Sequence, residues 1–183
     1  LVIELIGGIN PARELITTAL NSGASVVTGN KALLATHGGQ LLELAQAKGV
    51  DLLFEAAVAG AIPVVRTVKE GLAGDKIISI SGILNGTTNY ILDEMTTKGL
   101  DYDTALAAAQ QLGYAEADPT ADVEGLDAAA KAAILATLAF GQEVTLADVS
   151  VTGISKITKA DIDQAAARGG VLRLLGTVQA PAG

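Results

Sequence analysis

The sequence has no cysteine and no tryptophan, and its single histidine is His37. Disulfides and thiolate metal sites are therefore excluded, as are sites that need several histidines. No hydrophobic run reaches the roughly 18 to 20 residues of a membrane-spanning helix. The first residues also lack the positive charge of a secretory signal peptide. We therefore expect a cytoplasmic protein with no membrane partner.

Positive charge is scarce as well. Twelve Lys and Arg residues stand against 20 Asp and Glu residues, which gives a net charge of −8. Binding to nucleic acid through counterion release needs clustered positive charge, so we expect no nucleic-acid partner. Aromatic residues contribute only 3% and hydrophobic residues 50%, so the core must consist mainly of Ala, Leu, Ile and Val. The G-x-G-x-x-G, P-loop and G-x-S-x-G motifs are all absent.

Hydrophobic runs alternate with helical patterns in the first half of the chain. We expect strands at 1–6, 24–28 and 51–56. A helix after Asn10-Pro11, with Asn10 as N-cap, should end near residue 21, and a second should run from Asn30 to Lys48 with a candidate break at "HGG" (37–39). Strands and helices alternating at this spacing predict parallel βαβ units with right-handed crossovers.

The second half has a different pattern, and we place a domain boundary near residue 60. The expected helices are 63–72, 85–98, 103–112, 127–140 and 161–168, with strands at 76–81 and 171–179 and an acidic loop at 114–124. The chain begins inside a hydrophobic strand, "LVIELI", without an initiator Met. We therefore expect it to be a piece of a longer protein.

Two short segments of the first half could bind a ligand. In "VVTGNKALLA" (26–35), Asn30 and the first amides of a helix could hold an anion beside Lys31; the alternative is a capped helix with an exposed lysine. In "FEAAVAGAIP" (54–63), Glu55 is the only charged residue. A buried carboxylate needs a partner, which could be a hard cation that also accepts backbone carbonyls, or simply backbone amides or Lys31.

The stretch "GYAEADPTADVEGLDAAAK" (113–131) is rich in carboxylates. It could be a solvated loop, but Asp127 and Lys131 are four residues apart and share one helix face. Lys131 is also the only charge between Ala128 and Gln142. Carboxylates beside one lysine suit a small zwitterion, whose ammonium group the acids would bind while the lysine moves a proton.

The stretch "GILNGTTNYIL" (82–92) gathers small and amide side chains where an expected strand passes into a helix. It is either an elaborate turn or a backbone cleared for a ligand. Together with "NKALLA" (30–35), "EAAVAGAIP" (55–63) and the acidic stretch, it resembles the homoserine dehydrogenase family. The four motifs occur in the family's order, and the resemblance covers most of residues 1–170.

The resemblance implies an α/β fold. Residues 1–60 would be the end of a Rossmann-like NAD(P)-binding domain, and residues 61–183 a truncated catalytic and dimerisation domain with a mixed sheet. The implied activity is an oxidoreductase that interconverts L-homoserine and L-aspartate 4-semialdehyde by hydride transfer with NADP or NAD. This step belongs to threonine, methionine and isoleucine biosynthesis, and the family implies a homodimer or higher homo-oligomer.

The resemblance also implies roles for single residues. Lys131 would be the catalytic acid/base and Lys31 a second lysine near nicotinamide and substrate. By the same resemblance, the substrate would be bound by Glu116, Asp127 and Asp122, and the cofactor by Lys31, Gly113, Gly8 and Asn85. A monovalent cation, Na⁺, would be bound by Glu55 and the carbonyls of Val58, Gly60 and Ile62.

Two other interpretations remain open from the sequence. The chain could be a catalytically silent substrate-binding and dimerisation module, because the family's phosphate-binding loop would precede Leu1 and its closing segment would follow Gly183. It could also derive from another amino-acid dehydrogenase of similar architecture.

Overall fold

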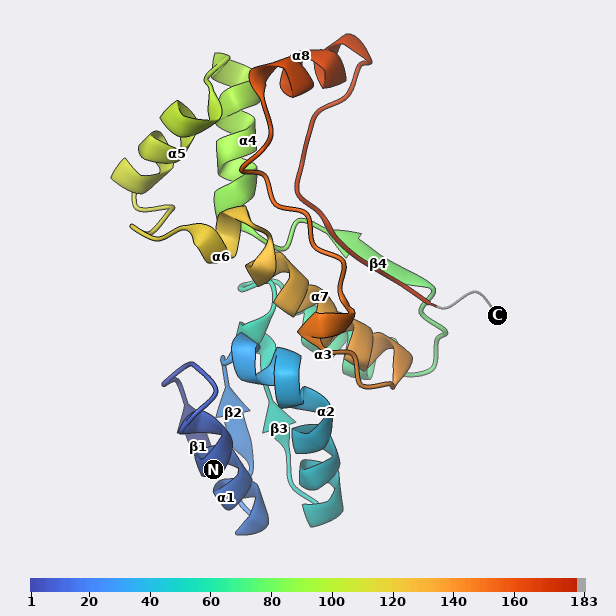
Figure 1. Ribbon diagram of the computed structural model, residues 1–183. Coiled ribbons are helices and arrows are strands. Elements are labelled where there is room, and N and C mark those ends of the chain that lie inside the picture. Colours follow the sequence, from blue (N-terminus) through green and yellow to red (C-terminus); the bar gives the residue numbers. More distant parts are fainter. Residues whose placement is uncertain (181–183) are drawn as a thin grey trace. The chain divides into compact units, whose positions relative to one another are not determined.

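The computed structural model in Figure 1 describes residues 1–180, so the last three residues of the expected second domain lie outside the described part. The chain forms two compact units. Unit 1 comprises residues 1–80, 130–149 and the segment from Thr177 onward, and unit 2 comprises residues 81–129 and 150–176.

Unit 1 contains a three-stranded parallel sheet in the order β1-β2-β3, formed by Val2–Glu4, Val26–Thr28 and Leu52–Leu53. Helices α1 (Ala12–Asn21) and α2 (Lys31–Lys48) connect these strands and lie side by side (Figure 1). Right-handed crossovers that advance across a sheet in one direction place their helices on the same face. The expected βαβ arrangement is confirmed, and it brings the carboxyl ends of β1 and β2 to one edge.

The starts of the two helices differ from each other. Helix α1 begins at Ala12 with Pro11 at the N-cap position, so the expected N-cap at Asn10 is wrong. Helix α2 begins as expected, because the Asn30 side chain accepts a hydrogen bond from the Leu33 amide at 3.1 Å. The "HGG" segment does not break α2, which continues from Lys31 to Lys48. Gly38 is buried within this helix and lines a small apolar cavity.

The segment after β3 is less regular than expected. The strand ends at Leu53 and a 3-10 turn, η1 (Glu55–Ala57), follows it, so a strand reaching residue 56 is wrong. The expected helix at 63–72 is split into α3 (Val64–Arg66) and a π turn, η2 (Thr67–Gly71). Glu55 accepts hydrogen bonds from the Val65 and Arg66 amides at the start of α3.

Unit 2 is mainly helical and is organised around α4 (Gly86–Lys98), which packs on α5 (Tyr102–Gln111), α6 (Thr120–Val123) and α8 (Lys159–Ala167). Its core includes Ile91, Leu92, Met95, Ala105, Ala109 and Ile162. Fully burying a side chain such as Leu or Met contributes about 1.5–3 kcal/mol, so α4 supplies much of this unit's stability. The short helix α6 lies within the segment expected to be an acidic loop.

The remaining elements are α7 (Leu126–Phe140), the 3-10 turn η3 (Leu146–Asp148), and an antiparallel pair formed by β4 (Ser79–Gly82) and β5 (Gly176–Gln179). The expected strand 171–179 is too long, because regular pairing begins only at Gly176. Likewise β4 starts at Ser79 rather than at residue 76. Among the described residues, no helix has the length and hydrophobicity needed to cross a bilayer.

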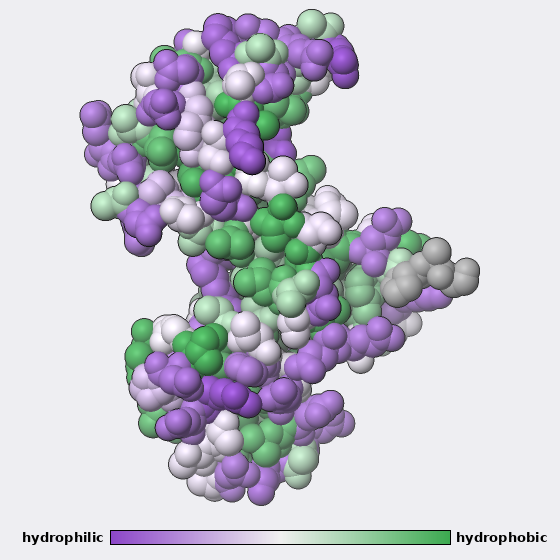
Figure 2. All heavy atoms as spheres, viewed as in Figure 1, coloured by the Kyte–Doolittle hydropathy of each residue, from purple (hydrophilic) through white to green (hydrophobic). Residues whose placement is uncertain are grey.

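Apolar side chains are exposed around the first strand of unit 1. Figure 2 shows hydrophobic surface there, and the residues concerned are Leu1, Ile3, Leu5 and Ile6. The same strand carries one polar residue inward, Glu4, which is 3% exposed. This burial makes Glu4 a candidate for a specific role.

Candidate functional site

The most connected polar group of unit 2 is an amide held between two carboxylates, which we call the amide–acid cluster (Asn85, Asp122 and Asp127). The Asn85 Nδ2 atom donates to Asp122 Oδ1 at 2.7 Å and to Asp127 Oδ2 at 2.9 Å. Asn85 is 5% exposed and Asp127 6%. Two carboxylates thus share one neutral donor group, with Asp122 half-buried at the outer side.

The start of α4 fixes the orientation of Asn85. Its Oδ1 atom accepts hydrogen bonds from the Thr88 amide at 2.9 Å and the Thr88 hydroxyl at 2.8 Å, so the side chain is the N-cap of α4. A helix was expected from residue 85, and α4 begins at Gly86 with Asn85 as its N-cap. Because both halves of its amide are engaged, Asn85 acts as a rigid bridge between the helix start and the two acids.

The first turns of α4 also hold the loop that carries Gly113 and Glu116. The Thr87 hydroxyl donates to the Tyr114 carbonyl at 2.7 Å, and the rings of Tyr90 and Tyr114 lie 4.7 Å apart. Gly113 has a φ of +77°, which explains why glycine follows α5. Glu116 is exposed, and its own carbonyl accepts from Gln110 at 3.1 Å. The structure therefore anchors the Gly113–Glu116 loop to the same helix as the amide–acid cluster.

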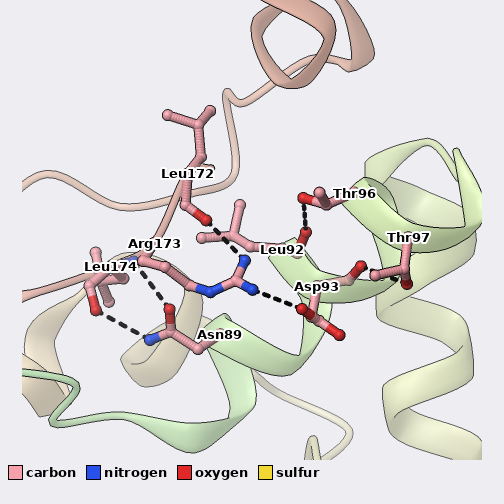
Figure 3. A network of polar contacts seen from close by, with 8 residues as sticks. All are labelled: Asn89, Leu92, Asp93, Thr96, Thr97, Leu172, Arg173 and Leu174. Carbon is pink, nitrogen blue, oxygen red and sulfur yellow. Dashed lines mark hydrogen bonds and ion pairs between the residues drawn. The ribbon is translucent and has the colours of Figure 1, made fainter. Parts of the chain in front are cut away.

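A second segment is held by the middle of α4, as Figure 3 shows. The Asn89 Nδ2 atom donates to the Leu174 carbonyl at 2.9 Å, and the Leu174 amide donates to Asn89 Oδ1 at 3.1 Å. Arg173 adds an ion pair with Asp93 at 2.6 Å. The Asn89 side chain thus bonds to the backbone of Leu174 as a neighbouring strand would, within a segment that is not part of a sheet.

Lys131 lies one helical turn after Asp127 in α7 and is half-buried. The residues on either side of it in α7, Ala130 and Ala132, are buried. The spacing places Asp127 and Lys131 on the same helix face, as expected. A lysine amine can take up and release a proton, so this position suits acid/base chemistry.

In unit 1, the carboxyl ends of β1 and β2 carry a connected polar network. The Thr28 hydroxyl donates to Glu4 Oε2 at 2.6 Å and accepts from the Asn30 amide at 3.0 Å. Asn30 Nδ2 donates to the Gly8 carbonyl at 2.7 Å. Lys31, the exposed first residue of α2, follows directly. The candidate residues Gly8 and Lys31 therefore flank one buried network.

Hydrogen bonding determines the charge of Glu4. Burial raises the pKa of the Glu4 carboxyl, but hydrogen bonds from Thr28, Gly7 and Ile6 more than offset this and hold that pKa below its ordinary value. Glu4 is therefore ionised at neutral pH and acts as an acceptor only.

Glu55 has backbone partners in unit 1. Its two carboxylate oxygens accept from the Val65 amide at 3.0 Å and the Arg66 amide at 2.9 Å. This matches one of the alternatives left open by the sequence. The loop that follows has positive φ at Ala59 (51°) and Ala61 (66°), an unusual conformation for alanine.

Sequence reasoning missed Glu4, Thr28 and Asn89. The signal for Glu4 was present, because it is a lone carboxylate inside a hydrophobic strand, the same pattern that singled out Glu55. Asn89 gave no signal, since its partner lies 85 residues away. Within residues 1–180, no three His, Cys, Asp or Glu side chains form a group that could hold a metal.

Comparison with known proteins places these features in context. A sequence profile described as homoserine dehydrogenase matches residues 63–182, and one described as the homoserine dehydrogenase NAD binding domain matches residues 1–55. A homoserine dehydrogenase of Corynebacterium glutamicum is 58% identical over 175 residues, which are 96% of this chain and 39% of that protein. The chain thus spans about two fifths of the curated relatives it matches.

Solved structures of homoserine dehydrogenases are similar to this chain as well. A homoserine dehydrogenase from Thiobacillus denitrificans superposes with a TM-score of 0.94 at 48% identity, covering 97% of this chain and 42% of that one. A hyperthermophilic archaeal homoserine dehydrogenase in complex with NADPH has a TM-score of 0.81 at 30% identity, covering 97% of this chain and 52% of that one.

Proposed function

Because this chain belongs to the homoserine dehydrogenase family, we propose that the full-length protein containing it interconverts L-homoserine and L-aspartate 4-semialdehyde with NAD(P)(H). The observation that carries the proposal is the amide–acid cluster, whose Asp127 lies in α7 four residues before Lys131. The likenesses give no support to a catalytically silent module or to a different amino-acid dehydrogenase.

We assign the substrate's ammonium group to the carboxylates. Asp127 is buried and oriented by Asn85, while Asp122 and Glu116 stand further out. Carboxylates fixed in this way bind an ammonium group with little loss of side-chain freedom, because their rotamers are already ordered. The Asn85 amide is neutral, so it donates to both acids without adding a positive charge beside them.

We assign the proton transfer to Lys131. In the oxidising direction its amine takes the hydroxyl proton of homoserine as a hydride leaves the carbon that bears this hydroxyl. In the reducing direction its ammonium group returns that proton to the aldehyde oxygen. The bound nicotinamide supplies or accepts the hydride.

The residues at the edge of the unit 1 sheet fit a nicotinamide cofactor. Gly7 and Gly8 have φ values of +81° and +71°, and a Cβ at either position would meet nothing within 4 Å. The loop backbone is therefore open to close approach. We propose that Gly8 and Lys31 contact the cofactor, with Gly113 and Asn85 as further contacts carried over from the resemblance, in a nucleotide domain ending near residue 60.

Substitution of Lys131 tests the mechanism. In the full-length protein, Lys131→Ala should lower kcat by at least about 100-fold, the contribution of a positioned acid/base, while the Kd for NADPH stays unchanged. Lys48→Ala, at the exposed end of α2, is the matched control and should retain full activity. Full turnover by the Lys131 variant would refute the assignment.

We also propose that a monovalent cation, Na⁺, binds Glu55 and the carbonyls of Val58, Gly60 and Ile62. The support is the backbone: left-handed residues at 59 and 61 alternate with these three positions and can turn their carbonyls to one side. Replacing NaCl by choline chloride at constant ionic strength should lower the thermal midpoint of the wild type. The same exchange should leave Glu55→Gln unaffected, and equal shifts in both would contradict the proposal.

Assembly and cellular role follow from the same family membership. We propose a cytoplasmic homodimer or higher homo-oligomer that acts in threonine, methionine and isoleucine biosynthesis. Light scattering after size-exclusion chromatography of the full-length protein measures the first point, and a monomeric mass at micromolar concentration would contradict it.

A further inference from the structure

Glu4 is the most deeply buried charged side chain among the described residues, and the proposed chemistry does not use it. Its Oε1 atom accepts from the Ile6 amide at 2.7 Å and the Gly7 amide at 3.1 Å, while Oε2 accepts from Thr28. A buried carboxylate is tolerated only when its oxygens are satisfied, as these are. The carboxylate therefore fixes the turn that leads to Gly8.

The direction of each hydrogen bond in the network is determined. A hydroxyl has one proton, and Thr28 donates its proton to Glu4. Thr28 can therefore only accept from the backbone amide of Asn30. Asn30 in turn caps α2 through Oδ1 and holds the Gly8 carbonyl through Nδ2. The chain of bonds thus starts at β1, crosses to β2 and returns to the loop after β1.

We propose that Glu4 and Thr28 are positioning residues, which act through Asn30 to fix Lys31 and Gly8 relative to each other. The inference rests on the proposed function, because it takes Lys31 and Gly8 to contact cofactor and substrate. Thr28 is 1% exposed and cannot itself reach a ligand. Its hydroxyl sets where α2 begins, and Lys31 is the first residue of that helix.

Thr28 offers a sharp test, because valine has the same shape without the hydroxyl and serine keeps the hydroxyl. In the full-length protein, Thr28→Val should lower kcat about 10- to 100-fold, the scale expected when a reacting group is misplaced by about 1 Å. Thr28→Ser should restore most of kcat. Ser25→Ala is the matched control: its hydroxyl accepts from the Asp51 amide just before β2, and its loss should leave kcat unchanged.

A second readout does not depend on activity. Reductive ¹³C-methylation of the lysines gives a resonance for Lys31, assigned by its absence in Lys31→Arg. This resonance should move in Thr28→Val and in Glu4→Gln, and stay in place in Ser25→Ala. If Thr28→Val fails to fold, Glu4→Gln takes its place in both measurements, because an amide has a single acceptor oxygen and cannot accept both from Thr28 and from the backbone amides of Ile6 and Gly7. A purely structural role would lower the thermal midpoint but leave kcat and the Lys31 resonance of the folded protein unchanged.

The experiments distinguish failure of the proposed role of Lys31 from failure of the positioning role of Glu4 and Thr28. Full kcat in Lys31→Ala would refute the role of Lys31 and the inference with it. An inactive Lys31→Ala, combined with full kcat and an unmoved Lys31 resonance in Thr28→Val, would refute the inference alone. Loss of kcat in Thr28→Val with rescue by serine supports it.

Discussion

Replacing Asn85 by aspartate changes the charge of the amide–acid cluster with almost no change of shape. The substitution removes two donated hydrogen bonds, at 2.7 and 2.9 Å, and puts a third carboxyl where the donor stood. A hydrogen bond to a charged group contributes about 1.5–3 kcal/mol, so Asn85→Asp should lower the free energy of unfolding by about 3 kcal/mol or more at pH 8. This is a large part of the roughly 5–15 kcal/mol that stabilises a typical domain.

The loss should depend on pH. Flanking carboxylates raise the pKa of the new carboxyl in the folded state above its unfolded value of about 3.9. A raised folded pKa means that stability is greatest at low pH and falls as pH rises through that pKa. The deficit of Asn85→Asp relative to wild type should therefore grow between pH 5 and pH 8. Asn85→Ala, which adds no charge, is the control and should show a deficit of similar size at both pH values.

Tyrosine fluorescence during urea denaturation measures this directly. The chain has no tryptophan, and its three tyrosines, Tyr90, Tyr102 and Tyr114, all belong to unit 2. The signal therefore reports the unit that contains the cluster. A deficit for Asn85→Asp below about 1 kcal/mol at pH 8, or one that is the same at pH 5, would refute the reasoning, since a lost charged hydrogen bond alone exceeds that value.

Three further predictions concern packing, anchoring and acid stability. Gly153→Ala should destabilise unit 2 by about 1–3 kcal/mol through overpacking, because the new Cβ would lie 2.5 Å from a backbone oxygen. A Cβ at Gly86 would meet nothing within 4 Å, so Gly86→Ala should stabilise α4 by up to about 1 kcal/mol. The urea midpoints of the two variants measure both effects. Asn89→Ala should cost about 2 kcal/mol or more by leaving backbone groups unsatisfied, whereas Arg173→Ala, which breaks a partly exposed ion pair, should cost under about 1 kcal/mol in the same assay. Because the folded pKa of Glu4 is lowered, its contribution is complete above the unfolded value of about 4.3 and is lost as pH falls below it, so thermal midpoints of wild type should drop faster below pH 4 than those of Glu4→Gln.

Local signals explain which parts of the fold could be predicted. Asn30 was recognisable as an N-cap because an asparagine opened the helical pattern, and its side chain caps α2. The alternation of strands and helices was equally local. Errors arose where tertiary contacts override local preference: residues 171–175 favour a strand by composition, but the backbone of Leu174 bonds to the Asn89 side chain instead.

The candidate site shows the same division. The acidic stretch and Lys131 were evident from charge patterning, and Asp127 proved to be buried. The contact of Asn85 with Asp122 and Asp127 spans 37 and 42 residues, and no periodicity or propensity encodes such a pairing. Gly82 and Gly86 have open space where a Cβ would be, so no contact among residues 1–180 accounts for glycine at either position.

The contact between Asn89 and Leu174 has a consequence for how the sequence can vary. Asn89 binds only the peptide group of its partner, so position 174 should accept any apolar side chain that fits the core. Position 89 has no such freedom: aspartate lacks the donor, glutamine is one carbon too long, and alanine has neither donor nor acceptor. In a library selected for folding, residue 174 should therefore vary widely while residue 89 remains asparagine, although the two form a single contact.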